Sequence, residues 1–167
     1  QLKNNPKAKQ NNYLFITFSA EEKGLFGSKY FVENPTIDLT KVSYMLNMDM
    51  VGRLNAEKVL VINGVGTSPK WKPALESIEF GGIQAKTSDS GVGPSDHTAF
   101  YLKDIPVLHF FTGQHDDYHK PEDDSHLINY EGLYDVAGYM LQLIEHLDTP
   151  DKLAFSKTKE PEQRKAA

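Results

Sequence analysis

Apolar residues gather in four short runs that are separated by polar stretches. The runs cover residues 13–18, 42–50, 58–62 and 105–111. The first is a nearly continuous series of apolar and β-branched side chains, a pattern typical of a strand that is covered on both faces at the centre of a parallel sheet. The runs therefore predict four strands, and a weaker pattern over residues 83–87 predicts a short fifth strand.

Helical spacing of apolar residues is clearest near the carboxyl end. Between residues 130 and 147 an apolar residue recurs every three or four positions, and Asn129 stands where an N-cap is expected. Shorter helices are predicted over residues 25–33, from about residue 69 to 78, and over 95–101, where the first residue, a serine, is a candidate cap. Alternating strands and helices predict an α/β fold.

Composition narrows the class of protein. The 167 residues, of which 39% are hydrophobic and 25% charged, are enough for one domain with a core. A net charge of -5 without clustered Lys and Arg argues against a nucleic-acid surface, and no apolar run approaches the roughly 20 residues of a membrane-spanning helix. We expect one domain over residues 1–148 and a polar tail over 149–167 that frays.

Carboxylates stand at the carboxyl ends of the first two predicted strands. Glu21 and Glu22 follow the first strand, and Asp49 closes the second. Open α/β sheets bind their ligands at this edge. Taken alone, however, the glutamates would also suit the start of the next helix, and Asp49 would also suit a turn.

The polar loop over residues 112–124 carries the densest set of candidate ligands. It follows the last predicted strand and contains His115, Tyr118 and His119. The chain has no cysteine, so a metal site must use His, Asp and Glu. The two histidines have the H-x3-H spacing of a helical zinc clasp, but the Asp, Gly and Pro around them indicate a loop. We therefore take His119 alone as a ligand and His115 as a pocket residue.

The remaining histidines and the segment before them have less defined roles. Residues 81–94 are rich in Gly and Ser and are expected to form a pocket wall, and the stretch leading to Ser95 lacks the strand and second glycine of a nucleophile elbow. His97 lies near the substrate or satisfies a hydrogen bond within its short helix. His109 and His126 are expected to be structural or solvated.

Four segments, in this order, resemble the zinc aminopeptidases of peptidase family M28. They are Phe18-Ser19-Ala20-Glu21-Glu22 with Gly24-Leu25-Phe26-Gly27-Ser28, residues 46–53, Ser95-Asp96-His97, and residues 111–123. Four ordered motifs are far more specific than any one of them. The resemblance spans about residues 13–147 and implies a three-layer α/β/α sandwich with a mixed, mostly parallel sheet that lacks its amino-terminal part.

The resemblance also implies a role for each matched residue. Glu21 matches the general base, and Tyr118 matches the tyrosine that hydrogen-bonds the developing oxyanion. Glu22 and His119 match ligands of one zinc ion, and Asp49 matches a ligand of a second. Two zinc ions held in this way activate a shared water and polarise the scissile carbonyl.

The implied substrate is a peptide that loses its amino-terminal residue. Asp96 matches a position that lines the pocket in related zinc enzymes, and we expect His97, His115 and Phe111 to lie beside it. Many relatives are exported, so a periplasmic or secreted location is expected.

The chain departs from the family at its amino end. The complete two-zinc site also needs a histidine and a bridging aspartate from segments before the strand that matches residues 13–18, and residues 1–20 contain neither. We therefore expect fewer than two zinc ions, or none, to bind, and no peptide hydrolysis by this chain alone. An uncovered strand edge predicts self-association or contact with an amino-terminal segment.

Two alternatives from other classes remain. A glutaminyl-cyclase-like acyltransferase shares the fold and a similar set of Glu, Asp and His residues. A non-catalytic interaction domain would retain the scaffold without working metals.

Overall fold

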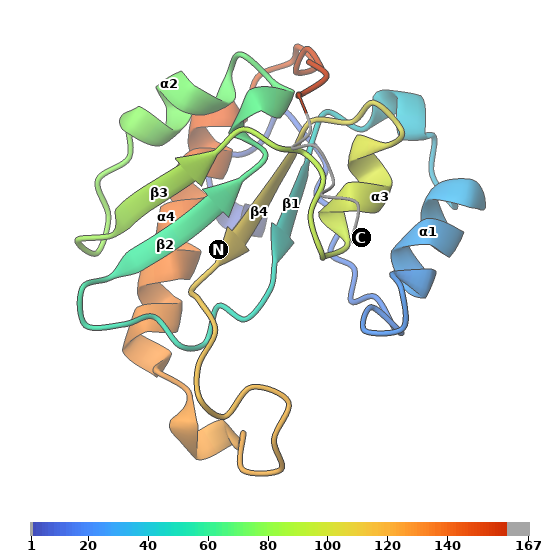
Figure 1. Cartoon of the computed structure of the whole chain (residues 1–167). Coiled ribbons are helices and arrows are strands. Elements are labelled where there is room, and N and C mark those ends of the chain that lie inside the picture. The colour runs from blue at the N-terminus through green and yellow to red at the C-terminus, as the bar shows by residue number, and fades with distance from the viewer. Residues whose placement is uncertain (1, 160–167) are drawn as a thin grey trace.

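A single four-stranded sheet organises residues 2–159, the part of the chain that the computed structural model describes (Figure 1). Its strands are β1 (Met45–Met48), β2 (Val59–Asn63), β3 (Gln84–Ser88) and β4 (Val107–Phe111), in the spatial order β1-β4-β2-β3. The pairs β1–β4 and β2–β3 are parallel, and β2–β4 is antiparallel. The expected mixed, mostly parallel sheet is confirmed.

Helices cover both faces of this sheet. Helices α2 (Trp71–Glu76) and α4 (Tyr130–Leu147) pack on one face, and α3 (His97–Tyr101), with α1 (Phe26–Glu33) against it, packs on the other. Two separate apolar clusters result, one on each side of the strands. None of the described helices is long and apolar enough to cross a membrane.

Strand β4 lies at the centre of both clusters. Leu108 and Phe110 belong to the cluster under α2 and α4, whereas Val107 belongs to the cluster under α1 and α3. All three side chains are fully buried, as expected when successive residues of a strand point to opposite faces. The continuous apolar run over residues 105–111 therefore reflects a strand that is covered on both sides.

Helix α4 has the predicted bounds. The Asn129 side chain accepts a hydrogen bond from the Gly132 N–H at 2.9 Å and donates one to the Leu54 carbonyl at 2.8 Å. The first bond satisfies a free donor of the first turn, as an N-cap does. The second anchors the start of the helix to the segment before β2.

The strand predicted over residues 13–18 is absent from the structure. These residues pair with no strand among residues 2–159, and Phe15 is 76% exposed. Their composition suits a strand with neighbours on both sides, but in the described part of the chain β1 is an edge strand and no further strand flanks it. The ends of the run are anchored instead by side chains: the Phe18 ring packs against Phe31 and Phe100, and the Tyr13 hydroxyl donates a 2.8 Å hydrogen bond to Asp148 Oδ1.

The carboxyl tail is packed where the structure describes it, so the expectation that it frays is wrong for residues 149–159. Leu153 is buried, the ring of Phe155 packs on Tyr101, and the Ser156 N–H donates a 2.8 Å hydrogen bond to the Thr67 carbonyl. Residues 160–167 lie outside the described part of the chain. The few apolar residues of this tail therefore suffice to hold it against the domain.

The Thr67 hydroxyl joins three segments inside the core. It accepts hydrogen bonds from Trp71 Nε1 at 2.9 Å and from the Val107 N–H at 3.0 Å. Its own proton lies within reach of two carbonyl oxygens, those of Gly64 at 2.7 Å and Val107 at 2.9 Å. Both Thr67 and Trp71 are fully buried, so no water replaces these bonds when the hydroxyl is lost.

We predict that Thr67→Val destabilises the chain while Thr67→Ser largely preserves it. Valine keeps the shape but leaves two buried N–H donors without acceptors, at a cost of roughly 1–3 kcal/mol each. Serine retains the hydroxyl and loses only a methyl group. Urea unfolding followed by tryptophan fluorescence measures both variants, and equal stability of the two would contradict this role of the hydroxyl.

Candidate active site

The turn before α1 carries Glu21 and Glu22. The Glu21 carbonyl accepts a 2.9 Å hydrogen bond from the N–H of Gly24, whose φ of 109° suits glycine. Within α1, Gly27 lies so close to the turn that a Cβ there would stand 2.5 Å from the Ser19 carbonyl oxygen. Gly24 thus allows the tight turn that carries the glutamates, and Gly27 allows the first turn of α1 to pack directly against it.

The ends of β1 and β4 are tied together beside Asp49. The Asp49 N–H donates a 3.1 Å hydrogen bond to the Phe110 carbonyl, and the Thr112 hydroxyl donates one to the Met50 carbonyl. Because the two strands are parallel, both end at the same edge of the sheet, where the loop over residues 112–124 begins (Figure 1). This edge has the location expected of a ligand site in an α/β protein.

Arg53 holds the loop over residues 112–124 in shape. Its Nη2 atom lies 3.0 Å from Asp117 Oδ2 and 2.7 Å from Asp123 Oδ1. His115 joins the same cluster, with ring nitrogens 3.8 Å from each of these two aspartates. Its assignment to the substrate pocket stays a prediction.

The loop brings His119 to the glutamate turn. His119 Nε2 lies 2.7 Å from Glu22 Oε1, although 97 positions separate the two residues in the sequence. The Tyr118 ring stacks on the His119 ring, with 3.8 Å between centroids. Two of the predicted ligands of one zinc ion are therefore in direct contact, and the tyrosine predicted to stabilise the oxyanion lies beside them.

Unusual backbone conformations cluster at these residues. Ala20, Met50 and His119 have φ values of 56°, 51° and 57°. Non-glycine residues rarely adopt positive φ, and such strain is typical of functional sites. The first two immediately flank Glu21 and Asp49, so each contributing segment makes a sharp turn where it presents its side chain.

Neighbouring charges at this edge shift the pKa values of Glu21 and Tyr118. Burial raises the pKa of the Glu21 carboxyl, and the negative charges of Asp49, Glu22 and Asp96 raise it further. Loss of hydration likewise raises the pKa of the Tyr118 phenol, followed by the charges of Glu22, Asp49 and Glu21. A raised pKa makes a carboxylate a stronger proton acceptor, as a general base requires.

The donors at this edge fit zinc in kind but fall short in number. An imidazole nitrogen from His119 and a carboxylate oxygen from Glu22 are ligands that zinc takes in proteins. Within residues 2–159, however, no group of three or more His, Asp or Glu side chains is placed to hold a metal ion. The described residues thus present a partial ligand set.

The expected pocket residues Asp96 and His97 lie at the start of α3. Asp96 is largely buried, and burial raises the pKa of its carboxyl while a hydrogen bond with Ser28 opposes the shift. The buried ring of His97 has no hydrogen-bond partner among the described residues. The alternative that His97 satisfies a hydrogen bond within its short helix is therefore wrong. Ser95 does not cap this helix, because its hydroxyl instead accepts a 2.8 Å bond from Asn47 Nδ2.

Sequence reasoning missed the position of His109. Of the two roles expected for it, structural or solvated, its exposure of only 4% fits the structural one, whereas His126 is exposed. His109 stacks on His97 at 4.5 Å and on Phe111 at 6.0 Å between centroids, and its Nε2 atom faces Asp49. The sequence feature that could have indicated this position is the place of His109 in a predicted strand that leads to the candidate site.

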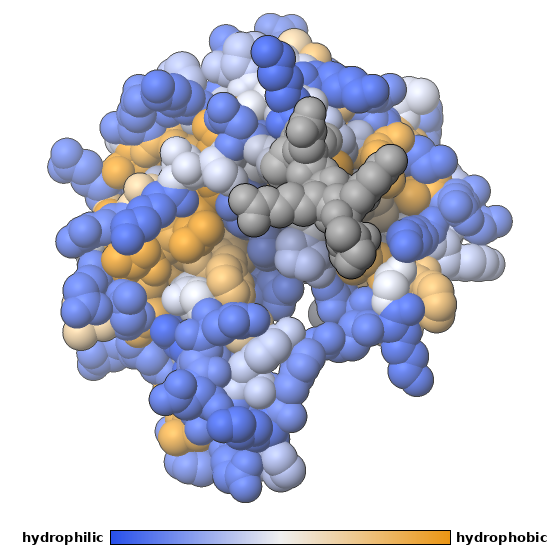
Figure 2. All heavy atoms as spheres, in the orientation of Figure 1, coloured by the Kyte–Doolittle hydropathy of each residue, from blue (hydrophilic) through white to orange (hydrophobic). Residues whose placement is uncertain are grey.

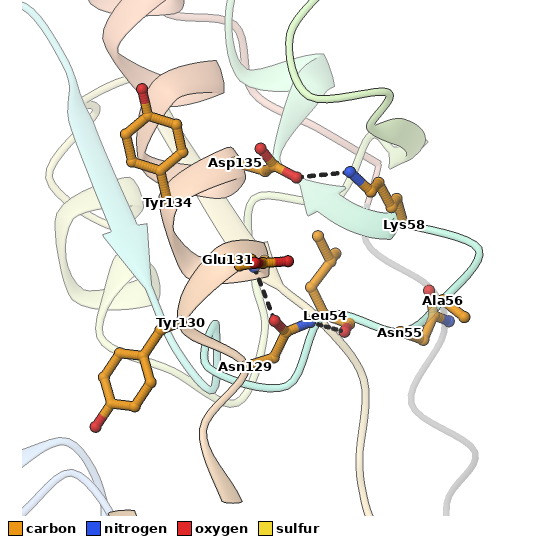
Figure 3. A pocket seen from close by; sticks show the side chains of 10 residues that line it. Leu54, Asn55, Ala56, Lys58, Asn129, Tyr130, Glu131, Tyr134 and Asp135 are labelled. Carbon is orange, nitrogen blue, oxygen red and sulfur yellow. Dashed lines mark hydrogen bonds and ion pairs between the residues drawn. The ribbon is translucent and has the colours of Figure 1, made fainter.

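A separate hollow lies at the amino end of α4 (Figure 3). Leu54, Lys58, Tyr130 and Asp135 are among its lining residues, and an ion pair of 2.8 Å joins Lys58 to Asp135. It contains none of the predicted catalytic or metal residues. In Figure 2 mostly hydrophilic residues cover the lower part of the molecule, where Figure 1 shows the loop after β4.

The α/β/α layers, with Asp49 at the end of β1 and the Glu22–His119 contact beside it, are features of a hydrolase of the zinc-peptidase class. Residues 1–144 match the family model described as Peptidase family M28. The chain belongs to peptidase family M28.

Curated relatives are bacterial and fungal enzymes. The chain is 35% identical over 100 residues to leupeptin-inactivating enzyme 1 of Streptomyces exfoliatus, a match that covers 59% of this chain and 22% of that protein. It is 32% identical over 129 residues to aminopeptidase YwaD of Bacillus subtilis (strain 168), covering 71% of this chain and 28% of the relative. The chain thus spans less than a third of the length of these two relatives.

Solved structures show the same fold. The aminopeptidase from Aneurinibacillus sp. strain AM-1 superposes with a TM-score of 0.64 at 26% identity, covering 89% of this chain and 35% of that chain. BSAP, a zinc aminopeptidase from Bacillus subtilis, superposes with a TM-score of 0.59 at 26% identity, covering 83% and 37%. The expected family and fold are confirmed, over part of the relatives' length.

We predict that Glu21→Gln stabilises the metal-free chain at neutral pH. A raised pKa means that the folded state favours the protonated carboxyl, so this contribution is present at low pH and is lost as pH rises through the folded pKa. Glutamine removes the ionised group, and its advantage should vanish below the unfolded pKa. Thermal unfolding from pH 3 to pH 8 tests this, with Glu57→Gln as an exposed control; a difference that does not vary with pH would contradict it.

Proposed function

We propose that this chain supplies part of the two-zinc site of an aminopeptidase that releases amino-terminal residues from peptides. The 2.7 Å contact between Glu22 and His119 carries the proposal. The two side chains come from distant segments, and the sequence predicts both as ligands of one zinc ion. Membership of family M28 supports the same reaction class.

The proposed ligands divide between two ions. Glu22 and His119 hold one zinc ion, and Asp49 at the end of β1 contributes to the other. When bound, the zinc pair supplies Lewis acidity that polarises the scissile carbonyl and lowers the pKa of water. The loop contacts of Arg53 keep His119 facing the glutamate turn.

Glu21 and Tyr118 act on the proton and on the developing charge. The Glu21 carboxylate accepts a proton from the attacking water and delivers it to the departing amine. Its raised pKa brings its proton affinity closer to that task. The Tyr118 phenol, whose pKa is also raised, stays protonated and donates a hydrogen bond to the oxyanion.

The remaining ligands in this proposal come from protein segments that this chain does not contain. The partial donor set within residues 2–159 and the partial coverage of the relatives both support this view. Two donors bind zinc more weakly than the three or four of a complete site. The chain alone is therefore proposed to be inactive.

We also propose that the region around the amino-terminal run contacts another polypeptide. Leu14, Phe15 and Ile16 are 57%, 76% and 39% exposed, and β1 is an edge strand of the described sheet. Contiguous exposed apolar residues and an open strand edge are both features of interaction surfaces. A second copy of this chain, or the remainder of a longer peptidase, would cover these apolar residues and pair with the open strand edge.

Zinc titration followed by calorimetry tests the proposed ligands. We predict weak zinc binding by the chain, and a loss of affinity of roughly tenfold or more on His119→Ala, since even supporting residues of metal sites have effects of this size. His126→Ala removes an exposed histidine outside the site and serves as the matched control.

Two results would overturn the proposal in different ways. Equal zinc affinity in the His119→Ala variant and the parent chain would remove His119 from the site. Zinc-dependent release of an amino-terminal residue from a peptide by the purified chain would show instead that the site is complete without further segments.

A further inference from the structure

A row of polar side chains crosses the sheet towards Asp49. The Ser88 hydroxyl on β3 donates a 2.6 Å hydrogen bond to Asn63 Oδ1 on β2. Asn63 Nδ2 lies 3.3 Å from His109 Nδ1 on β4, and His109 Nε2 lies 4.0 Å from Asp49 Oδ2. Strand register aligns the row, because Asn63 stands opposite both Ser88 and His109.

The Asn63 amide determines which nitrogen of His109 carries the proton. The Ser88 hydroxyl donates to Asn63 Oδ1, and this leaves Asn63 Nδ2 to face His109 Nδ1 at 3.3 Å. An amide nitrogen only donates, so His109 Nδ1 accepts and the proton resides on Nε2. The reversed amide would place the proton on Nδ1 and leave the Nε2 lone pair facing the Asp49 carboxylate, which is electrostatically repulsive.

The His109 ring is held in this orientation by its neighbours. His97 stacks on it with an interplanar angle of 10°, and Phe111 stacks on it at 25°. Within residues 2–159 no acceptor forms a hydrogen bond with Nε2. Asp49 is the carboxylate that this nitrogen faces, and its side chain is 37% exposed whereas that of His109 is 5% exposed.

We propose that His109 is a positioning residue for Asp49: its Nε2–H, held in place by Asn63, orients the carboxylate so that the exposed side is free for a metal ion. The inference rests on the proposed role of Asp49 as a zinc ligand. At 4.0 Å the contact is electrostatic rather than a hydrogen bond, and neighbouring groups that orient metal ligands raise metal affinity. His109 contributes no bond to the metal itself.

The tautomer can be measured on the metal-free chain. Long-range proton–nitrogen NMR correlations of histidine labelled with nitrogen-15 distinguish the two neutral forms, and His109→Gln assigns the signal. We expect the proton on Nε2 in the parent chain and a mixed population in Asn63→Leu, which lacks the amide donor. A proton on Nδ1 in the parent chain would overturn the inference.

Zinc affinity of two matched variants provides the second test. Glutamine at position 109 places an amide N–H near the position of Nε2, whereas asparagine reaches only as far as Nδ1. We expect His109→Gln to bind zinc within about threefold of the parent and His109→Asn to bind roughly tenfold or more weakly. Equal losses in both variants would show a merely structural role and would overturn the inference.

The two tests separate this inference from the proposed function. If the parent chain binds no zinc, the prediction of weak zinc binding by this chain fails, and the tautomer measurement still decides the hydrogen-bond assignment. If the parent binds zinc through His119 but both His109 variants lose affinity equally, the two-zinc proposal stands and the positioning role fails.

Discussion

The parallel pairing of β1 with β4 is the constraint on which the candidate site depends. Its register places Met48 opposite Phe110, and the Asp49 N–H continues the pairing by one more hydrogen bond. Asp49 and the loop that carries His119 therefore leave the sheet at the same edge. A slip of one residue would turn every side chain of β1 to the opposite face and separate these groups. The Glu22–His119 contact then joins the amino-terminal turn to this edge.

The same alternation gives the sheet one apolar face and one mixed face, on which polar side chains lie beside the second apolar cluster. Leu60, Ile62, Leu108 and Phe110 point towards α2 and α4 and are fully buried there. Residues at the alternate positions include Asn47, Asn63 and His109, which find polar or aromatic partners instead. Burying polar groups is costly unless they are paired, so these side chains are held in defined geometry. Both faces contribute buried apolar side chains, and the mixed face also supports the edge near Asp49.

Local patterns predicted the parts of the fold that local interactions determine. Helix α4 begins and ends as predicted, because Asn129 and the apolar spacing specify it within one segment. The strand expected over residues 13–18 is absent because a strand exists only with a partner, and the run alone does not reveal whether one is present. His109 was undervalued for a related reason, since its position beside Asp49 follows from register between strands. The tail was misjudged because Leu153 and Phe155 find sites on distant segments.

The central claim is that one imidazole and carboxylates from distant segments converge on a metal at this edge. X-ray diffraction from zinc-soaked crystals, recorded at the zinc absorption edge, locates the metal without assuming its ligands. The account predicts an anomalous peak within bonding distance of His119 Nε2 and a Glu22 carboxylate oxygen, with Asp49 alongside. A peak found only at His126 or His146, with Glu22 and His119 free of metal, would contradict it.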